Sequence, residues 1–208
     1  KRKKTSKAGK ILWWIAFLAA VAVFLGAGYQ LISTLGEYRA AQKEYEKLED
    51  YVTRPQEAEE VQSVQENESQ EPEGPVIDFE ALKAVNEDVV GWIYVEALDL
   101  NYPIMQGEDN EYYLHRTTEK TYNFAGSIFL DYANKADFSD CNSIVYGQNM
   151  KDGSMFGRLK QFRERETYEK SLYFWVCTPE KNYRYQIFSA YETCLLYTSD
   201  AADDRISV

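Results

Sequence analysis

Two helical patterns of hydrophobic residues occupy the first quarter of the chain. Residues 11–36 contain no charged side chain, and such an apolar run is long enough to cross a bilayer, which takes roughly 20 residues. Beyond it, apolar positions recur every three or four residues, which predicts an amphipathic helix that ends near Pro55. We therefore expect a membrane helix followed by a juxtamembrane helix or a short coiled coil. The recurring positions are Leu35, Tyr38, Ala41, Tyr45, Leu48 and Val52.

The hydrophobic pattern changes from residue 76 onward, where short apolar and β-branched stretches alternate with turn residues. Two short helices are expected, one at residues 79–85 behind the capping residue Asp78 and one at 154–162. Many short strands with small helices are typical of a mainly β fold, a barrel with helical inserts. The pattern places strands at residues 89–95, 100–105, 127–132, 143–146, 173–177 and 183–191.

A polar segment separates the two patterned regions. Residues 56–75 are rich in Glu and contain no basic residue. Such a segment cannot bury enough apolar surface to offset the entropy lost on ordering, which predicts a disordered stalk. The predicted organisation is a basic tail at 1–10, a membrane anchor at 11–33, a helical and then acidic stalk at 34–75, a globular domain at 76–193 and a separate tail at 194–208.

The charge distribution predicts a membrane topology. The first ten residues carry six Lys and Arg and no acid, whereas the remaining residues carry 17 basic and 34 acidic groups. By the positive-inside rule, the N-terminus then lies in the cytoplasm and the chain after the anchor lies outside the cell. A cleaved signal peptide is the competing interpretation of the apolar run. The acidic outer part argues against nucleic acid as a partner, because phosphate binding requires clustered Lys and Arg.

Cysteine and histidine are scarce in this chain. Cys141, Cys177 and Cys194 are irregularly spaced, which predicts neither a disulfide framework nor a zinc site. Since no other metal-ligand cluster stands out either, we expect no metal and no cofactor. Cys141 and Cys177 fall at the ends of predicted strands, where we expect buried structural thiols. The single histidine, His115, is expected to be a surface or structural side chain.

Four segments of the globular region occur in an order that points to one family. They are Val90-Gly91-Trp92-Ile93 with Asn101-Tyr102-Pro103-Ile104-Met105-Gln106; Asp109-Asn110-Glu111-Tyr112-Tyr113-Leu114-His115; Ala125-Gly126-Ser127-Ile128-Phe129-Leu130-Asp131; and Tyr146-Gly147-Gln148 with its tail to Phe156. In this order, behind an anchor and a stalk, they resemble the class B sortases. Sortases are membrane-anchored cysteine transpeptidases of Gram-positive bacteria, and the resemblance implies a sortase-type β-barrel over about residues 76–193.

The resemblance also implies three catalytic side chains and a substrate groove. In the family, a Cys thiolate attacks the threonyl carbonyl of a sorting motif, a His moves protons and an Arg stabilises the oxyanion. A wall amine then resolves the thioester. Gln148 occupies the position of the family's His, and its amide cannot act as an acid or a base. By the same resemblance Asn110, Leu114 and Tyr146 line the substrate groove, although such residue types are also common in cores.

The resemblance does not locate a counterpart of the family's nucleophilic Cys or of its Arg in this chain. Cys194 follows a Thr, as the family nucleophile often does, but it lies only 46 residues after Gln148. That separation is too short for the long helical insert of class B enzymes. The residues from Cys194 to Asp204 resemble the translation of a sequencing adapter, so we expect that the natural reading frame was cut at about Thr193. A divergent natural terminus is the alternative.

Together these features predict a C-terminally truncated sortase with an incomplete barrel behind one membrane anchor. The expected activity is cleavage of an Asn-Pro-x-Thr type of sorting motif and attachment of surface proteins to the cell wall. This copy is expected to be inactive as written, because Gln148 replaces the His and the Cys and Arg positions are missing. The expected partners are sorting-motif proteins, a peptidoglycan precursor or other amine acceptor, and the membrane. Two alternatives remain open: a catalytically dead relative that binds sorting peptides, and a membrane-anchored scaffold that uses its coiled-coil helix.

Overall fold

The computed structural model of the chain describes residues 7–54 and 74–192. By its internal contacts the chain divides into two units, Lys1–Lys43 and Glu44–Val208. Most of the predicted acidic stalk and the whole predicted tail at 194–208 lie outside the described residues. The two units are therefore described separately.

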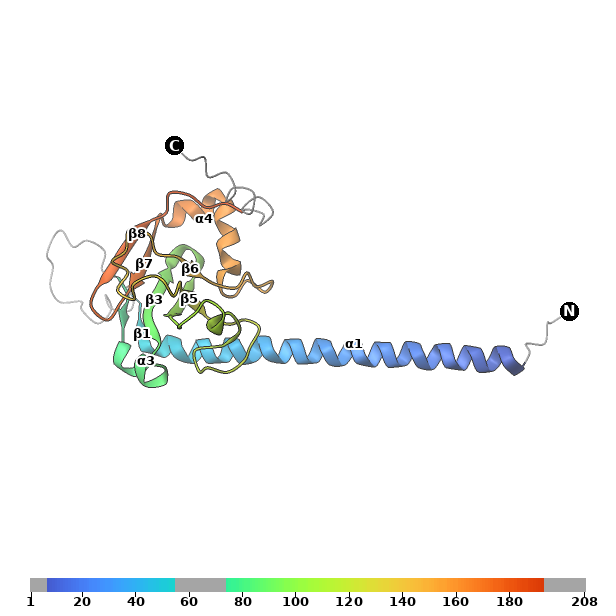
Figure 1. The fold of residues 1–208 in the computed structure, drawn as a ribbon. Helices are drawn as coiled ribbons and strands as arrows, with labels where there is room; N and C mark the ends of the chain where they lie inside the picture. Colours follow the sequence, from blue (N-terminus) through green and yellow to red (C-terminus); the bar gives the residue numbers. More distant parts are fainter. Residues whose placement is uncertain (1–6, 55–73, 193–208) are drawn as a thin grey trace, which may run out of the picture. The chain divides into compact units, whose positions relative to one another are not determined.

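The first unit is formed by most of one long helix, α1, which runs from Lys7 to Leu48 (Figure 1). The predicted membrane and juxtamembrane helices are thus one continuous helix. Its apolar side chains point outward into the surroundings, and Trp13, for example, is 60% exposed. Among the described residues this is the one helix that is long and apolar enough to cross a membrane, judged by length and composition.

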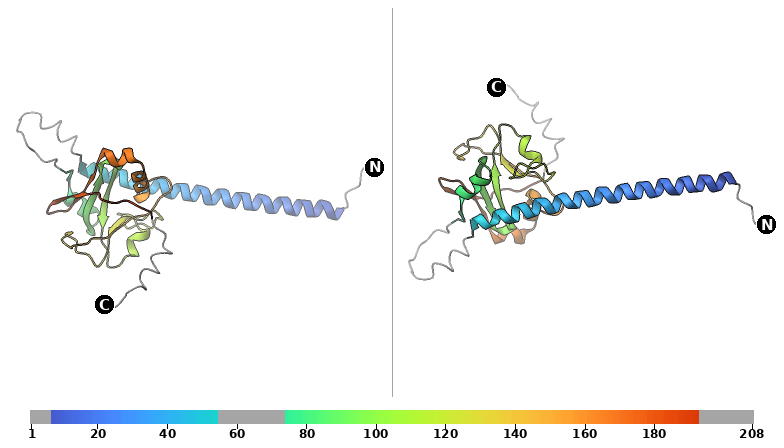
Figure 2. Two further views of the ribbon diagram at one scale, coloured as in Figure 1. Left: turned by 90° about the horizontal axis from the view of Figure 1, so that it is seen from above. Right: turned by 90° about the horizontal axis from the view of Figure 1, so that it is seen from below.

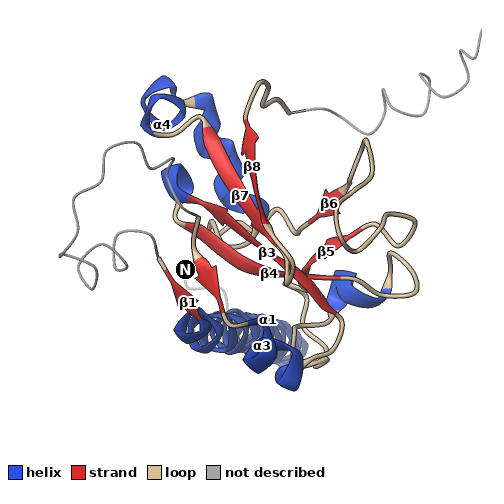
Figure 3. Ribbon diagram, turned by 90° about the vertical axis from the view of Figure 1, so that its left-hand side faces the viewer, coloured by secondary structure: helices blue, strands red, loops and turns tan. Residues whose placement is uncertain are grey.

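The second unit is built on a six-stranded sheet, with the strand order β6-β5-β4-β3-β7-β8 among the described residues (Figure 3). All neighbouring strands are antiparallel except the parallel pair β4 and β5. The sheet curls into a half-barrel, so the predicted mainly β fold with an incomplete barrel is confirmed. The strands are β3 (Val89–Val95), β4 (Leu100–Met105), β5 (Ile128–Leu130), β6 (Val145–Tyr146), β7 (Tyr173–Cys177) and β8 (Asn182–Gln186).

Strand β3 lies near the middle of the sheet and is buried along almost its whole length. This explains its continuous apolar sequence, because a strand covered on both faces needs apolar side chains at odd and even positions. Trp92 is fully buried, and its indole donates a hydrogen bond of 2.5 Å to Asn101 Oδ1 on the neighbouring strand. The indole N–H, the polar group of this large core side chain, therefore has a hydrogen-bond partner.

Short helices and loops cover the two sides of this sheet. In both views of Figure 2, the orange segment with η4 (Phe156–Arg163) and α4 (Arg165–Lys170) lies on one side and the loops between β4 and β6 lie on the other. Helix α3 (Phe79–Val85) begins at Asp78, whose side chain accepts a 2.9 Å hydrogen bond from the amide of Ala81, as predicted. The remaining turns are η1 (Glu49–Tyr51), η2 (Glu96–Leu98) and η3 (Tyr112–His115).

The last turn of α1 belongs to the second unit. Tyr45, Leu48 and Val52 are buried, and strand β1 (Val52–Thr53) pairs with β2 (Val76–Ile77). The globular unit therefore includes residues from Glu44, whereas the predicted domain began at residue 76. The apolar stripe that indicated a coiled coil is used here to cover the core of the same chain.

Two predicted elements differ from the structure. The helix expected at 154–162 is the 3₁₀-helix η4 followed by α4. The strand expected at 183–191 ends at Gln186, because the chain leaves the ladder there and Phe188 is 95% exposed. Aromatic residues beyond Gln186 carried a strand signal in the sequence, but without a neighbouring strand to pack against they form none.

Candidate functional site

The backbone around Gln148 is held by the loop that follows strand β6. The amide of Phe156 donates a 3.0 Å hydrogen bond to the carbonyl of Gln148, and Asn149 pairs with Met155 in an isolated β-bridge. A Cβ atom at Gly147 would lie 2.7 Å from the ring of Phe156, so only glycine allows this approach. These contacts place residue 148 independently of its own side chain.

The side chain of Gln148 bridges two loops. It is half-buried, and its Nε2 donates a 3.2 Å hydrogen bond to the carbonyl oxygen of Leu114 in η3. A carboxamide has no proton to exchange near neutral pH, so it cannot serve as a general acid or base. Gln148 therefore acts as a fixed hydrogen-bond donor between the end of β6 and η3.

A carboxylate joins two more of the predicted site residues. One oxygen of Asp131, Oδ2, accepts hydrogen bonds from Asn110 Nδ2 at 2.8 Å and from the Tyr146 hydroxyl at 2.9 Å. The side-chain oxygen of Asn110 in turn accepts a 3.0 Å hydrogen bond from the amide of Tyr132. Asn110 is thereby held at both ends of its amide, and Tyr146 is held by its hydroxyl.

These hydrogen bonds determine the charge states in the network. The backbone amide of Ala133, followed by the side chains of Asn110 and Tyr146, lowers the pKa of Asp131 below its ordinary value. Its negative charge then raises the pKa of the Tyr146 phenol through their hydrogen bond. Asp131 is therefore a carboxylate and Tyr146 a neutral phenol over the whole physiological range. The phenol donates its proton in the hydrogen bond to Asp131. Tyr146 as a whole is 37% exposed, and its ring centroid lies 5.2 Å from that of Phe129.

The four predicted site residues are therefore joined in two pairs, one through Asp131 and the other by a direct hydrogen bond. Asn110 and Leu114 come from the loop before β5, and Tyr146 and Gln148 come from the end of β6. The sequence reasoning did not single out Asp131, which links the first pair. An acid directly after an apolar strand was the available signal, because such a residue lies at the strand end near the neighbouring loops.

The cysteines do not take part in this arrangement in the described part of the chain. Cys177 is buried and its Sγ lies 3.8 Å from the carbonyl of Pro75, which confirms a structural thiol. Burial raises its pKa to about 12, so it is a poor nucleophile. Cys141 is exposed, and the prediction that it is buried was wrong because it lies in a loop before β6. Cys194 lies outside the described residues.

His115 lies at the surface of the described structure. His115 is an exposed residue whose ring lies 6.1 Å from that of Tyr122, which confirms a surface histidine. Within residues 7–54 and 74–192, no group of three His, Cys, Asp or Glu side chains could hold a metal ion.

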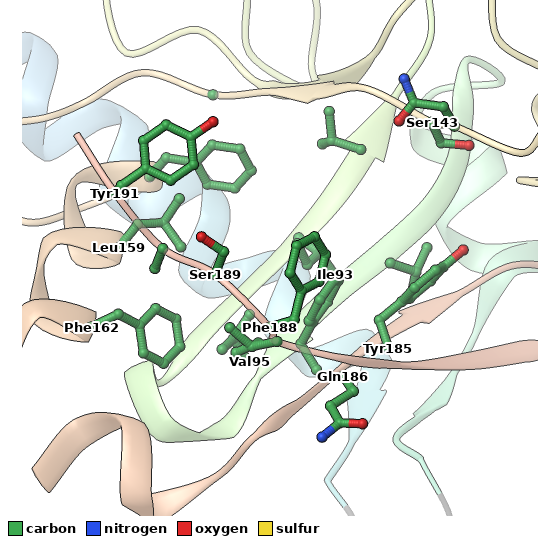
Figure 4. Close-up of a pocket in the computed structure, with 18 of the residues that line it drawn as sticks. Ile93, Val95, Ser143, Leu159, Phe162, Tyr185, Gln186, Phe188, Ser189 and Tyr191 are labelled. Carbon is green, nitrogen blue, oxygen red and sulfur yellow. The ribbon is translucent and has the colours of Figure 1, made fainter. Parts of the chain in front are cut away.

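An apolar groove lies on the concave side of the half-barrel, next to the candidate site. Its volume is about 890 Å³, and Gly147 and Asn149 on either side of Gln148 contribute to its lining. Figure 4 shows side chains from β3, β8 and η4 that point into it, together with those that follow β8. The labelled apolar residues are Ile93, Val95, Leu159, Phe162, Tyr185, Phe188 and Tyr191.

Comparisons with known proteins show which proteins this chain is similar to. No protein-family model matches the chain. Sortase B of Staphylococcus aureus is 32% identical over 179 residues, which are 86% of this chain and 68% of that protein. Sortase B of Listeria monocytogenes is 42% identical over 112 residues, 54% of this chain, and the chain spans only 46% of its length. A solved structure of a Staphylococcus aureus sortase B–substrate complex matches with a TM-score of 0.57 at 27% identity, over 80% of this chain and 78% of that chain.

Proposed function

This chain belongs to the class B sortases, and we propose that it recognises sorting-motif peptides as part of a cysteine transpeptidase reaction. The reaction cleaves a sorting motif of the Asn-Pro-x-Thr type and transfers the acyl product to an amine of the cell wall. One observation carries the proposal: two loops far apart in sequence meet through Asn110, Asp131 and Tyr146 on one side and through Leu114 and Gln148 on the other.

The chemistry of these groups suits a short peptide. The exposed ring of Tyr146 and the side chain of Leu114, each 37% exposed, offer apolar surface for a proline or an aliphatic side chain. Asn110 keeps its amide fixed by its two partners, so its orientation is set before a peptide arrives. The substrate complex reported for the Staphylococcus aureus relative is consistent with a peptide site in this fold.

Within that reaction, we propose that the described residues bind the peptide and do not carry out the proton transfer. A sortase thioester forms when a thiolate attacks the threonyl carbonyl and the leaving amine receives a proton. Gln148 cannot supply that proton, and the thiol of Cys177 is buried and protonated. The described residues therefore contribute recognition rather than proton transfer.

The proposed location is the outer face of a cell membrane, with the N-terminus in the cytoplasm. The apolar part of α1 and the basic residues before it support this topology. The proposed partners are surface proteins that carry the sorting motif and a peptidoglycan precursor or other amine acceptor.

Peptide binding by the full chain in detergent tests the proposal. A fluorescent Asn-Pro-x-Thr peptide should bind, and Tyr146→Ala should weaken binding about tenfold, because stacking and the Asp131 contact are lost together. Tyr173→Ala is the matched control, since Tyr173 is 41% exposed on β7. Equal affinity of the wild type and Tyr146→Ala would reject the assigned site.

A second candidate, a sortase relative that binds peptides and has no transpeptidase role, is favoured by the hydrogen bond from Gln148 to Leu114. In Gln148→His an imidazole replaces that amide. Cleavage of the peptide by Gln148→His would reject this candidate, whereas retained binding without cleavage would support it. A coiled-coil scaffold has less support, because Tyr45 and Leu48 are buried within the globular unit.

A further inference from the structure

The last turn of α1 makes buried polar contacts with the loops near the candidate site. Tyr45 is 6% exposed, and its hydroxyl donates a 2.7 Å hydrogen bond to the carbonyl of Gly126. The same hydroxyl lies 3.3 Å from Ser127 Oγ. One residue earlier, Glu44 accepts a 2.8 Å hydrogen bond from the amide of Glu119. Two adjacent side chains of the helix therefore hold the loop that follows η3, one at Glu119 and the other at Gly126.

Ser127 connects this helix turn to η3. Its amide donates a 2.9 Å hydrogen bond to the carbonyl of Tyr113, and its hydroxyl donates a 2.7 Å hydrogen bond to the carbonyl of Arg116. These two carbonyls belong to the first half of η3 and to the residue directly after it. Ser127 thereby holds η3 from both ends, and Tyr45 contacts Ser127 from the other side.

Gly126 extends the same connection to Leu114 and Gln148. It adopts a left-handed φ of +57°, and a Cβ atom there would collide with the carbonyl of Leu114. That carbonyl is the acceptor for the side chain of Gln148. An unbroken series of contacts therefore runs from Tyr45 through Gly126 and η3 to Gln148.

We propose that Tyr45 is a positioning residue, through which the last turn of α1 sets the position of η3 and hence of the Leu114–Gln148 contact. A 3₁₀-helix of four residues has weak internal hydrogen bonds, so its position depends on the groups around it. The hydroxyl of Tyr45, from the last turn of α1, acts on η3 through its contacts with Gly126 and Ser127. Its effect on peptides rests on the proposed function, whereas its effect on η3 does not.

Hydrogen–deuterium exchange on the full chain in detergent tests this role. Tyr45→Phe removes the hydroxyl and keeps the ring, which packs 5.3 Å from that of Tyr102. We expect exchange at residues 112–116 and 146–149 to rise about fivefold, because one buried hydrogen bond is lost, with no change elsewhere in the sheet. Ser127→Ala should give the same local rise. Tyr168→Phe is the matched control, since its hydroxyl also donates to a backbone carbonyl, that of Ile187.

The outcomes separate a positioning role from a merely structural one. Faster exchange confined to η3 and the end of β6 supports the proposal, and a parallel loss of peptide affinity in Tyr45→Phe extends it to recognition. Unchanged exchange at these residues, or an equal rise throughout the globular unit, overturns it. If the wild type binds no peptide, the proposed function fails, while the exchange result still decides the role of Tyr45.

Discussion

The candidate site and the apolar groove beside it differ in the contacts that their side chains make. In the site, Asn110, Tyr146 and Gln148 each have a hydrogen-bond partner at 2.8 to 3.2 Å. In the groove, Phe188 and Tyr191 are 95% and 82% exposed. The loops of the candidate site are therefore held in place by contacts among the described residues, whereas the groove presents apolar surface that water contacts.

The topology of the sheet explains this difference. The site lies in the connections between the neighbouring strands β4, β5 and β6, so loops that leave adjacent strands supply its contacts. The groove is lined from β3, β7 and β8 on one side and from the region of β6 on the other. Strands β6 and β8 are the two edges of the sheet among the described residues, and no ladder joins them there. Free edges and apolar surface of this kind favour association with other chains.

The largest expected effect comes from a substitution that disturbs the candidate site. Gly126→Ala places a Cβ atom against the carbonyls of Leu114 and Tyr113 at a φ of +57°. We expect the free energy of unfolding to fall by about 3 kcal/mol, because strain and a backbone collision add. The measurement is denaturant unfolding of the full chain in detergent.

Gly153→Ala is the control for this substitution. Gly153 has a φ of +82°, but open space surrounds the position of its Cβ atom. Only the conformational strain remains, so the loss should be about 1 kcal/mol. Equal losses in the two variants would show that the close packing of Gly126 on η3 does not matter for stability.

An intermediate effect concerns the charge of Asp131. Its pKa is lowered in the folded chain, so its contribution is fully present above its ordinary pKa of 3.8 and is lost as the pH falls through the lower folded value. Peptide affinity should therefore be constant from pH 7 to pH 5 and decline only in strong acid. Asp131→Ala should weaken binding roughly tenfold at pH 7, because Asn110 and Tyr146 lose their shared acceptor.

The isosteric variant Asp131→Asn sharpens this test. It keeps an oxygen for Tyr146 and removes the titrating proton, so its affinity should not change with pH over the same acidic range. Peptide titrations followed by fluorescence anisotropy measure both variants. A wild-type affinity that already declines between pH 7 and pH 5 would contradict the assignment of the ionised group to Asp131.

The smallest expected effect on stability belongs to the groove. Phe188→Lys replaces a side chain that is 95% exposed, so the free energy of unfolding should change by less than about 0.5 kcal/mol. Self-association should nevertheless decrease, because the substitution puts a charge on the apolar surface. Sedimentation velocity in detergent measures this. Tyr122→Lys, at a position 74% exposed outside the groove, should leave self-association unchanged.

Local sequence patterns predicted the elements whose signals lie within a few residues. The continuous apolar run of β3 and the cap of α3 by Asp78 are examples, since burial on both faces and a single side-chain hydrogen bond specify them. The candidate residues Asn110, Leu114, Tyr146 and Gln148 came from a family resemblance, and the structure joins them in pairs. Cys141 was misplaced because a strand end and a loop look alike over so few residues.

What the sequence by itself determined is the order of the elements, the apolar helix and the mainly β domain, because periodicity and residue chemistry are local properties. Only the tertiary structure decided that Asp131 links Asn110 to Tyr146 and that Tyr45 reaches Gly126 across 81 residues. A hydrogen bond depends on distance and angle in space, and chain folding alone brings such distant groups within 3 Å of each other.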